Sequence, residues 1–246
     1  MSIDDPAELA GLQRAGAVVA ATLRELGPRV RPGVTTAELD DAAERVFREH
    51  GARSGPRLDY DFPGTICISV DEEAVHGIPS ARRLRDGQLV KLDVTAELDG
   101  FYADACATVP VGEVAPVHRR LVDATRAALR RGMAAATAGA PLNAIGAAVE
   151  RVIAARGFSV CADLTGHGIG RRIHEPPTVA NVFDPGADEP LTRGLVITVE
   201  PIVAAGRGDV VGMPDGWTVR TRDGSAVAHA EHTIVVTEGA PLVLTG

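Results

Sequence analysis

The amino-acid sequence predicts an α+β fold made of a duplicated unit of helices and antiparallel strands. Two regions carry apolar residues at helical spacing, and each is followed by strand-like runs bounded by turn residues. A shift of 106 positions also lays six residues of the first region on identical residues of the second. The matched pairs are Gly33/Gly139, Ala42/Ala148, Glu44/Glu150, Arg45/Arg151, Val46/Val152 and Gly51/Gly157. We therefore expect two related halves with a site between them.

Two helices are predicted at the start of the chain. Apolar side chains recur at helical spacing over residues 6–26, and the stretch ends at Gly27 and Pro28. Thr35 and Glu38 have the spacing of a capping box, which predicts a second helix closed by Gly51. The apolar stripes of both helices indicate packing against a core, without a membrane or partner helix.

Strands are predicted next, and two acids interrupt them. Residues 64–70 have strand composition, and residues 88–109 predict a hairpin that turns near Asp99 and Gly100. Asp93 and Asp104 lie near the middle of its two apolar strands. Because aspartate is depleted in strand interiors, these residues suggest a site.

The second half repeats this order. Helices are predicted over residues 114–137 and 142–156, followed by a strand at 158–163 and a Gly/His segment at 166–175. Further strands are predicted at 195–204, 216–221, 226–237 and 241–245. No stretch resembles a linker, so a single domain over residues 1–246 is expected.

Composition narrows the class of protein. The chain has 45% hydrophobic residues and a net charge of −8, and its arginines are scattered, so nucleic-acid binding is not expected. Its three cysteines form no CxxC pair, which favours a reducing compartment. The acidic N-terminal stretch lacks the features of a signal peptide, and no apolar run is long enough for a membrane span. A cytoplasmic protein is the expectation.

Four acids in apolar, strand-like runs predict a cation site. They are Asp93, Asp104, Glu200 and Glu231. Buried carboxylates of one sign need a counter-charge, which two divalent cations would provide. His167, among small residues in TGHGIG, adds a nitrogen donor, and such a mixed set suits Mn, Fe, Co or Zn. Two ions of this kind about 3.5–4 Å apart can share a hydrolytic water.

Several sequence motifs resemble those of the bacterial-type methionine aminopeptidases, in the same order and at similar spacing over nearly the whole chain. The motifs are FPGTICIS, HGIP (76–79), KLDVT (91–95), DGFYADA (99–105), GHGIG with HEPP (166–177), ITVEPIV (197–203), GWTVRT (216–221) and EHTIVVT (231–237). The resemblance implies the duplicated pita-bread fold and removal of the initiator methionine from nascent polypeptides when the second residue is small. It also implies that Asp93 binds one metal, that His167 and Glu200 bind the other, and that Asp104 and Glu231 bridge both.

The resemblance assigns catalytic roles as well. Glu200 would carry the proton of the attacking water, His174 would stabilise the carbonyl as it becomes tetrahedral, and His76 would contact the peptide N–H or the developing oxyanion. The remaining four histidines have no such setting, and the first two of them are expected to be solvated helix positions. These are His50, His118, His229 and His232.

Four residues are expected to bind the substrate methionine. Phe62, Cys67 and Trp217 match positions that line the family's methionine pocket, and Tyr60 lies one residue away from another such position. Cys67 is expected to be a pocket thiol without a nucleophilic role, since no paired base is evident.

The chain departs from the family pattern in three places. Ile173 stands where an aromatic residue often precedes the second histidine, and Asp71 stands in place of the usual asparagine. Ala105 and Cys106 follow Asp104 where a threonine is common, so a supporting hydroxyl is expected to be missing.

Two alternatives remain beside the methionine aminopeptidase. One is a related X-Pro metallopeptidase, although only about 60 residues precede the first active-site strand and such enzymes usually carry a large N-terminal domain. The other is an inactive pita-bread binding protein, although none of the five ligand positions is lost. The expected partners are nascent peptide N-termini, with transient ribosome contact left open, and a monomer is expected.

Overall fold

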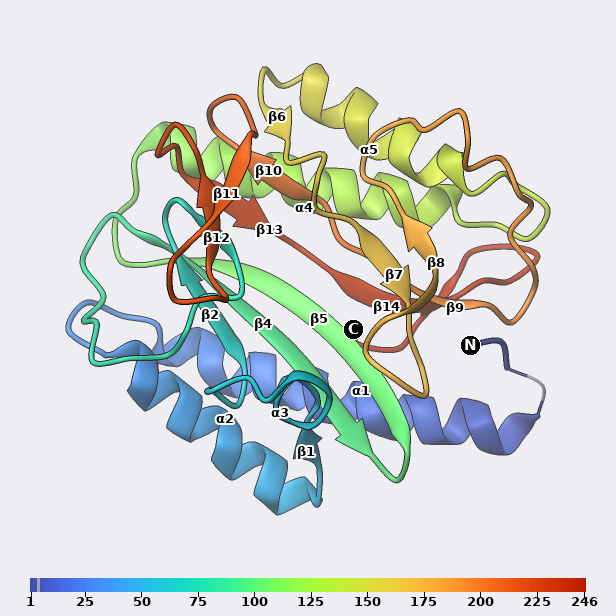
Figure 1. The fold of residues 1–246 in the computed structure, drawn as a ribbon, viewed down its shortest axis with the longest axis horizontal. Coiled ribbons are helices and arrows are strands. Elements are labelled where there is room, and N and C mark those ends of the chain that lie inside the picture. Colours follow the sequence, from blue (N-terminus) through green and yellow to red (C-terminus); the bar gives the residue numbers. More distant parts are fainter. Residues whose placement is uncertain (4) are drawn as a thin grey trace.

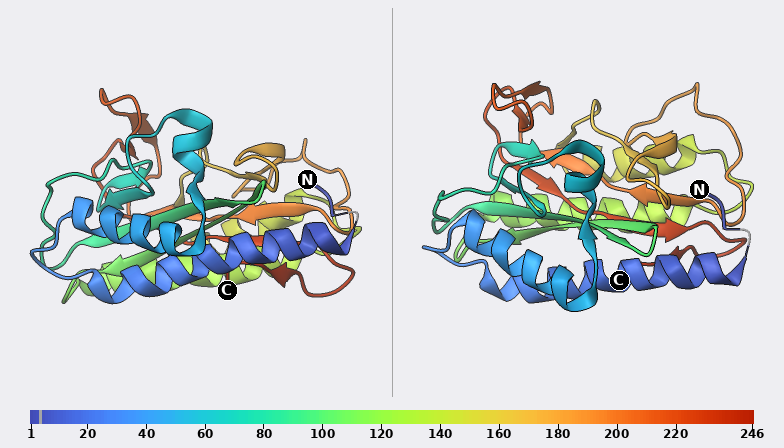
Figure 2. Two further views of the ribbon diagram at one scale, coloured as in Figure 1. Left: turned by 90° about the horizontal axis from the view of Figure 1, so that it is seen from below. Right: turned by 60° about the horizontal axis from the view of Figure 1, so that its bottom comes forward.

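A computed structural model of the chain describes residues 1–3 and 5–246. Most of its helices cover one side of a curved layer of strands (Figures 1 and 2). The short helix α3 (Gly55–Tyr60), the strands β11 (Val210–Gly212) and β12 (Val219–Thr221), and the loop after β7 (Gly166–Gly168) lie on the opposite side. The helices are α1 (Pro6–Leu26), the 3-10 turn η1 (Gly27–Arg29), α2 (Thr36–His50), α3 (Gly55–Tyr60), α4 (Pro116–Ala135) and α5 (Asn143–Ala154).

The strands belong to four small sheets. The first contains β1 (Arg53–Ser54), β2 (Cys67–Val70), β4 (Leu89–Leu98) and β5 (Phe101–Pro110), and the second contains β6 (Ser159–Val160), β10 (Ile202–Ala204) and β13 (Val227–His229). The third contains β3 (Glu73–Val75), β11 (Val210–Gly212) and β12 (Val219–Thr221). The fourth contains β7 (Gly166–Gly168), β8 (Glu175–Val179), β9 (Val196–Val199), β14 (His232–Val235) and β15 (Leu242–Val243). The α+β prediction is confirmed.

The first two helices begin and end where the sequence predicts. The Asp5 side chain accepts hydrogen bonds from the first backbone N–H groups of α1, and Pro6 opens the helix. Thr35 and Glu38 form the predicted capping box, in which the Glu38 N–H donates to Thr35 Oγ1 over 3.1 Å and Glu38 Oε2 accepts from the Thr35 N–H over 2.7 Å. Gly51 closes α2 in the left-handed conformation, at a φ of 69°.

Conformation supports the predicted duplication. Gly33 and Gly139 have φ values of 91° and 85°, and Gly51 and Gly157 have φ values of 69° and 72°. All four values lie in the left-handed region that favours glycine. The short strands β1 and β6 also follow α2 and α5 at equivalent positions, and each pairs with a longer strand of its own half.

Two long strands predicted from sequence are broken in the structure. The predicted strand 195–204 divides into β9 and β10 at Glu200 and Pro201, and the predicted strand 226–237 divides into β13 and β14 at Ala230 and Glu231. Pro201 has no N–H for a ladder, and β9 pairs with β14 while β10 pairs with β13. Both acids therefore lie at the transition from one sheet to another.

Other boundaries also differ from prediction. The expected strand 64–70 begins only at Cys67, and the expected strand 158–163 is reduced to β6. The six-residue helix α3 is not predicted, although Ser54 accepts a hydrogen bond at its start and Pro56 occupies its first turn. Such a short helix shows too few residues for a periodic signal.

Separate apolar clusters attach the helices to the strands. Side chains of α1 and α2, among them Val19 and Leu39, pack with Ile68 and Leu92 of the first sheet. Side chains of α4 and α5 pack in the same way against β10 and β13. Burial stabilises such contacts by about 25 cal/mol per Å² of apolar surface, which keeps the helices on this face of the strands. Within the part of the chain that the structure describes, no helix has the length and apolar character to cross a membrane.

Candidate metal centre

All five predicted metal ligands line one cavity of about 370 Å³. Asp93 and Asp104 come from β4 and β5, and His167 comes from β7. Glu200 and Glu231 occupy the two breaks between strands described above. The first half of the chain thus supplies two acids and the second half supplies the other three residues.

Paired strands hold the acids at defined positions. Asp93 lies opposite Cys106 in the hairpin, and Asp104 lies opposite Thr95, so the two aspartates are diagonal neighbours on one face. The Asp104 N–H donates to Thr233 Oγ1 over 2.9 Å, and that hydroxyl donates to the Asp104 carbonyl oxygen over 2.8 Å. This exchange connects the hairpin of the first half to β14 of the second.

The donor atoms are close enough to share a cation. One ligand atom from each of Asp104, His167 and Glu231 lies within 4.8 Å of the other two. Oε1 of Glu200 lies 3.5 Å from Nε2 of His167. Carboxylate oxygens together with one imidazole nitrogen are a donor set for borderline divalent ions.

The tautomer of His167 also fits a metal ligand. Its Nδ1 lies 2.9 Å from the carbonyl oxygen of Gly168, which can only accept, so Nδ1 carries the proton. Burial, followed by the neighbouring His174, lowers the pKa of His167 to about 4, so the ring is neutral near pH 7. Nε2 therefore directs a lone pair towards Oε1 of Glu200. Both atoms are acceptors, and a cation bound between them would satisfy both.

Burial and mutual repulsion raise the pKa values of the four acids. Burial raises the pKa of Asp104 to about 6. Burial, followed by repulsion from Asp104 and Glu200, holds the pKa of Asp93 well above its ordinary value. Burial also raises the pKa values of Glu200 and Glu231, which feel the charge of Asp104 as well. Carboxylates crowded in this way favour binding a cation.

Threonine hydroxyls hold some carboxylate oxygens and leave others open. Thr95 donates to Oδ2 of Asp104 and Thr198 donates to Oε1 of Glu200, each over 2.8 Å. Oδ1 of Asp104 and Oε1 of Glu231 are buried and have no hydrogen-bond partner within the part of the chain that the structure describes. A buried oxygen without a partner is costly, and a cation would satisfy both. The residues thus fit a metal centre.

These contacts correct the expectation that a supporting hydroxyl is missing. Ala105 and Cys106 indeed offer none, but Thr95 supplies one to Asp104 from the opposite strand. The departure at Asp71 lies outside the cavity, where its carboxylate accepts from the Leu89 N–H over 2.9 Å. Ile173 lines the cavity, and its N–H donates to Oδ2 of Asp59 over 3.2 Å.

His76 and His174 lie between two cavities. Both line the cavity of the metal ligands and a second cavity of about 490 Å³ on the side of β8. His167 and Glu200 also contact both spaces. The ring centroids of His174 and His167 are 4.2 Å apart, so His174 lies directly beside a predicted ligand. A chain that passed from one cavity to the other would cross between these side chains.

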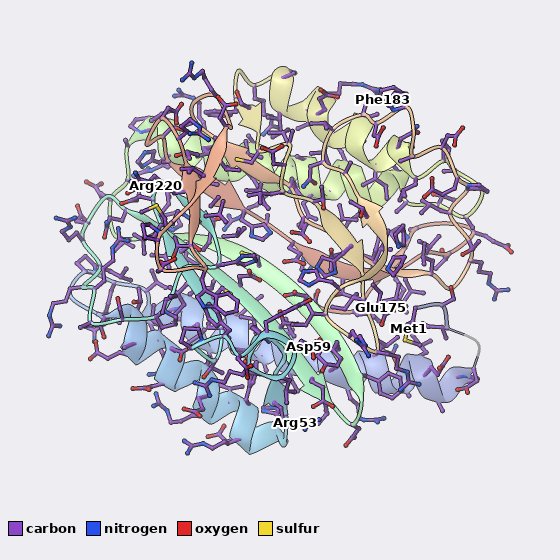
Figure 3. The ribbon with its side chains drawn as sticks, in the orientation of Figure 1. Met1, Arg53, Asp59, Glu175, Phe183 and Arg220 are labelled. Atoms are coloured by element: carbon purple, nitrogen blue, oxygen red, sulfur yellow. The ribbon has the colours of Figure 1, made fainter. Side chains whose placement is uncertain are left out.

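Helix α3 holds His174 in place. The hydroxyl of Tyr60 lies 2.6 Å from Nδ1 of His174. The preceding residue, Asp59, binds the backbone N–H of Ile173 and accepts from the Tyr102 hydroxyl over 2.9 Å. Figure 3 shows the position of Asp59 on α3 and of Glu175, the first residue of β8, which directly follows His174 in the sequence. Tyr60 therefore contacts the histidine directly as well as lining the cavity.

The other predicted substrate-binding residues form the apolar part of the same cavity. Phe62 and Trp217 pack edge to face, with their ring centroids 5.2 Å apart. Cys67 lies opposite Asp93 on the neighbouring strand β2. Burial, followed by the charge of Asp93, raises the pKa of the Cys67 thiol well above its ordinary value, so it is a neutral wall residue.

Sequence reasoning missed one histidine of the cavity. His229 was not among the predicted site residues, yet it lines the cavity and lies 3.6 Å from Glu231. Thr95 and Thr198 were missed as well. His229 and Glu231 are two positions apart, as alternating residues on one strand face are, which was the signal available.

Comparisons with known proteins identify relatives over nearly the whole chain. The sequence pattern of Metallopeptidase family M24 matches residues 10–238. "Methionine aminopeptidase 2" of Bacillus subtilis (strain 168) is 41% identical over 247 residues, covering 100% of this chain and 99% of that one. The crystal structure of methionine aminopeptidase from Rickettsia prowazekii superimposes with a TM-score of 0.95 and 38% identity, covering 100% of both chains. The prolidase from Pyrococcus furiosus shares the fold, with a TM-score of 0.78 and 21% identity over 99% of this chain and 65% of that one.

Proposed function

The chain belongs to metallopeptidase family M24, and on that premise we propose that it is a methionine aminopeptidase with the pita-bread fold. It would hydrolyse the first peptide bond of polypeptides that begin with methionine and carry a small second residue. The observation that supports this most is the convergence of five donor side chains, with unsatisfied buried oxygens, at one end of a partly apolar cavity.

Two divalent cations are part of the proposal, of the Co, Mn, Fe or Zn type. Asp93 would bind one, His167 and Glu200 would bind the other, and Asp104 and Glu231 would contact both. When bound, the cations would polarise the scissile carbonyl and lower the pKa of a water molecule towards neutrality. The open oxygens of Asp104 and Glu231 are suited to shared contacts because no protein donor occupies them.

The remaining polar side chains would handle protons and charge. Glu200 would accept the proton of the attacking water at its carboxylate. His174 would donate from Nε2 to the carbonyl oxygen as negative charge develops there, and His76 would contact the peptide N–H or the same oxygen. Both histidines lie at the boundary of the two cavities, where the scissile bond would sit.

The two cavities suggest how the substrate is oriented. The methionine side chain would enter the cavity lined by Phe62, Cys67 and Trp217, with Tyr60 at its edge, and the free amine would lie near the ligand cluster. The remaining peptide would leave through the second cavity. A bulky second side chain would meet His76 and His174 at the narrow boundary, which supports a preference for small residues.

A substrate panel tests the proposal against its alternatives. We expect the metal-loaded protein to cleave Met-Ala-Ser at least about 100-fold faster than Met-Lys-Ser, which corresponds to about 2.7 kcal/mol of discrimination in the transition state. X-Pro peptides should remain intact. Turnover of X-Pro peptides alone would favour the prolidase-like alternative, and no turnover with any divalent ion would favour the inactive binding protein. Liquid chromatography of the released methionine provides the measurement.

The contact between Tyr60 and His174 makes a second prediction. Partial burial and the charge of Asp59 raise the pKa of Tyr60, so its phenol remains protonated and can donate to Nδ1 of His174. That bond leaves the proton of His174 on Nε2, where the proposed role needs it. Tyr60→Phe is expected to lower kcat about 5–10-fold, as the loss of one hydrogen bond of about 1 kcal/mol implies.

A matched variant separates this effect from damage to α3. Tyr102→Phe also removes a phenol hydroxyl bound to α3, but that hydroxyl contacts Asp59 and leaves the bond to His174 intact. It should keep kcat within about twofold of the parent. Equal losses in both variants, or none in Tyr60→Phe, would contradict the role given to Tyr60.

We also propose that the chain acts as a cytoplasmic monomer on peptides emerging from the ribosome. Three buried cysteines, all free, support a reducing compartment. Size-exclusion chromatography with light scattering would test the monomer, and co-sedimentation with ribosomes would test transient contact.

A further inference from the structure

His229 is held rigidly beside the proposed metal ligands. It ends β13, where it pairs with Ile202, and only 2% of its surface is exposed. Its backbone exchanges two hydrogen bonds with the Thr108 hydroxyl, one from the His229 N–H over 2.8 Å and one to the His229 carbonyl oxygen over 2.7 Å. The position of the imidazole is thus determined by the strand and by β5.

Among the described residues, neither ring nitrogen has a hydrogen-bond partner. Nε2 lies 3.6 Å from Oε2 of Glu231 and 3.8 Å from Oε2 of Glu200, slightly beyond hydrogen-bond length. An imidazole carries at least one ring N–H that can be donated, and the nearest acceptor to Nε2 is the carboxylate of Glu231.

Of the four proposed ligands other than Asp93, three have a hydrogen-bond partner that orients their side chain, and Glu231 is the exception among the described residues. Asp104 and Glu200 each receive a threonine hydroxyl, and His167 is oriented by the Gly168 carbonyl. Within the described part of the chain, no hydrogen-bond donor reaches Oε1 of the buried Glu231 carboxylate. Nε2 of His229 faces the other oxygen of that carboxylate.

We propose that His229 is a positioning residue that donates its Nε2–H to Oε2 of Glu231 and so directs Oε1 towards the cations. The inference rests on the proposed metal centre. Direct ligation by His229 is the alternative arrangement, and the substitutions below separate it from hydrogen-bond donation. Partners that orient metal ligands in this way typically contribute 10–100-fold to metal affinity.

Three substitutions test this, with metal affinity as the primary readout. The amide nitrogen of glutamine can occupy the position of Nε2, whereas that of asparagine corresponds to Nδ1, and leucine offers no donor. We expect His229→Gln to bind Mn²⁺ within about threefold of the parent, and His229→Leu and His229→Asn to bind it about 10–100-fold more weakly in isothermal titration calorimetry. Thermal unfolding of the metal-free variants would verify that each folds.

The affinities of the three variants distinguish hydrogen-bond donation by His229 from direct metal ligation and from no role in metal binding. Parent-like affinity in folded His229→Leu would overturn the inference, and so would equal weakening in the glutamine and leucine variants, which would indicate imidazole ligation. A donor role is supported only by rescue with glutamine and not with asparagine. Because affinity is measured without peptide, a parent protein that binds Mn²⁺ but ignores methionyl peptides would contradict the proposed substrate alone.

Discussion

Asp104→Ala is expected to lose nearly all peptidase activity and to bind fewer metal ions per chain. Asp104 is buried, hydrogen-bonded to Thr95 and placed with His167 and Glu231 within 4.8 Å, so its carboxylate is proposed to contact both cations. Removing a shared ligand should lower kcat/KM at least about 1000-fold, which corresponds to about 4 kcal/mol. Metal analysis of the purified variant and peptide hydrolysis provide the two measurements.

Thermal unfolding of the metal-free variant and a control substitution separate loss of a ligand from loss of the fold. Burial raises the pKa of Asp104 to about 6 because ionisation is unfavourable among the other acids. Metal-free Asp104→Ala should therefore unfold at a temperature no lower than that of the metal-free parent. Asp123→Ala, on the exposed side of α4, should leave metal content and activity unchanged. Full metal content in Asp104→Ala would contradict a shared ligand.

His174→Ala is expected to reduce kcat about 100–1000-fold while metal content stays at the parent value. The reason is that His174 lies at the boundary of the two cavities and is proposed to stabilise charge that develops on the carbonyl oxygen. Its ring lies 4.2 Å from that of His167 but is not among the proposed ligands. Steady-state kinetics together with metal analysis would separate the catalytic role from ligation.

Two further variants sharpen this second result. His174→Gln retains an N–H donor near the position of Nε2 and should recover part of kcat. His50→Ala, at the end of α2, removes an imidazole that contacts the Val46 carbonyl oxygen through Nδ1 and lines neither of the two cavities, so it should leave kcat unchanged. Loss of metal from His174→Ala, or a rise in KM with normal kcat, would count against charge stabilisation.

Local sequence patterns predicted most of the fold and many residues of the candidate site. The capping box of Thr35 and Glu38 was readable because its contacts are three residues apart, and α1 was readable from its apolar spacing. Asp93 and Asp104 were noticeable because aspartate rarely occurs inside apolar strands. The roles of these and the other site residues remain proposals that the experiments above test.

Contacts between distant segments could not be read in this way. The strand breaks at Glu200 and Glu231 depend on which sheet each half-strand joins, and α3 depends on packing against the loop of His174. The hydroxyl that supports Asp104 comes from Thr95 on the opposite strand. The family motif had led us to look for it at the residues that follow Asp104 in the sequence. For His229 the sequence offered only its two-residue spacing from Glu231.

The sequence by itself determined the α+β class, the two helix pairs and a set of acids whose burial would require a counter-charge, because these follow from periodicity and from the free energy of desolvating a carboxylate. The tertiary structure alone decided which oxygens remain open, which nitrogen of His167 carries the proton, and that His229 faces Glu231. These features depend on distances of a few ångströms between segments far apart in the chain, and hydrogen bonds and ion contacts change steeply over such distances.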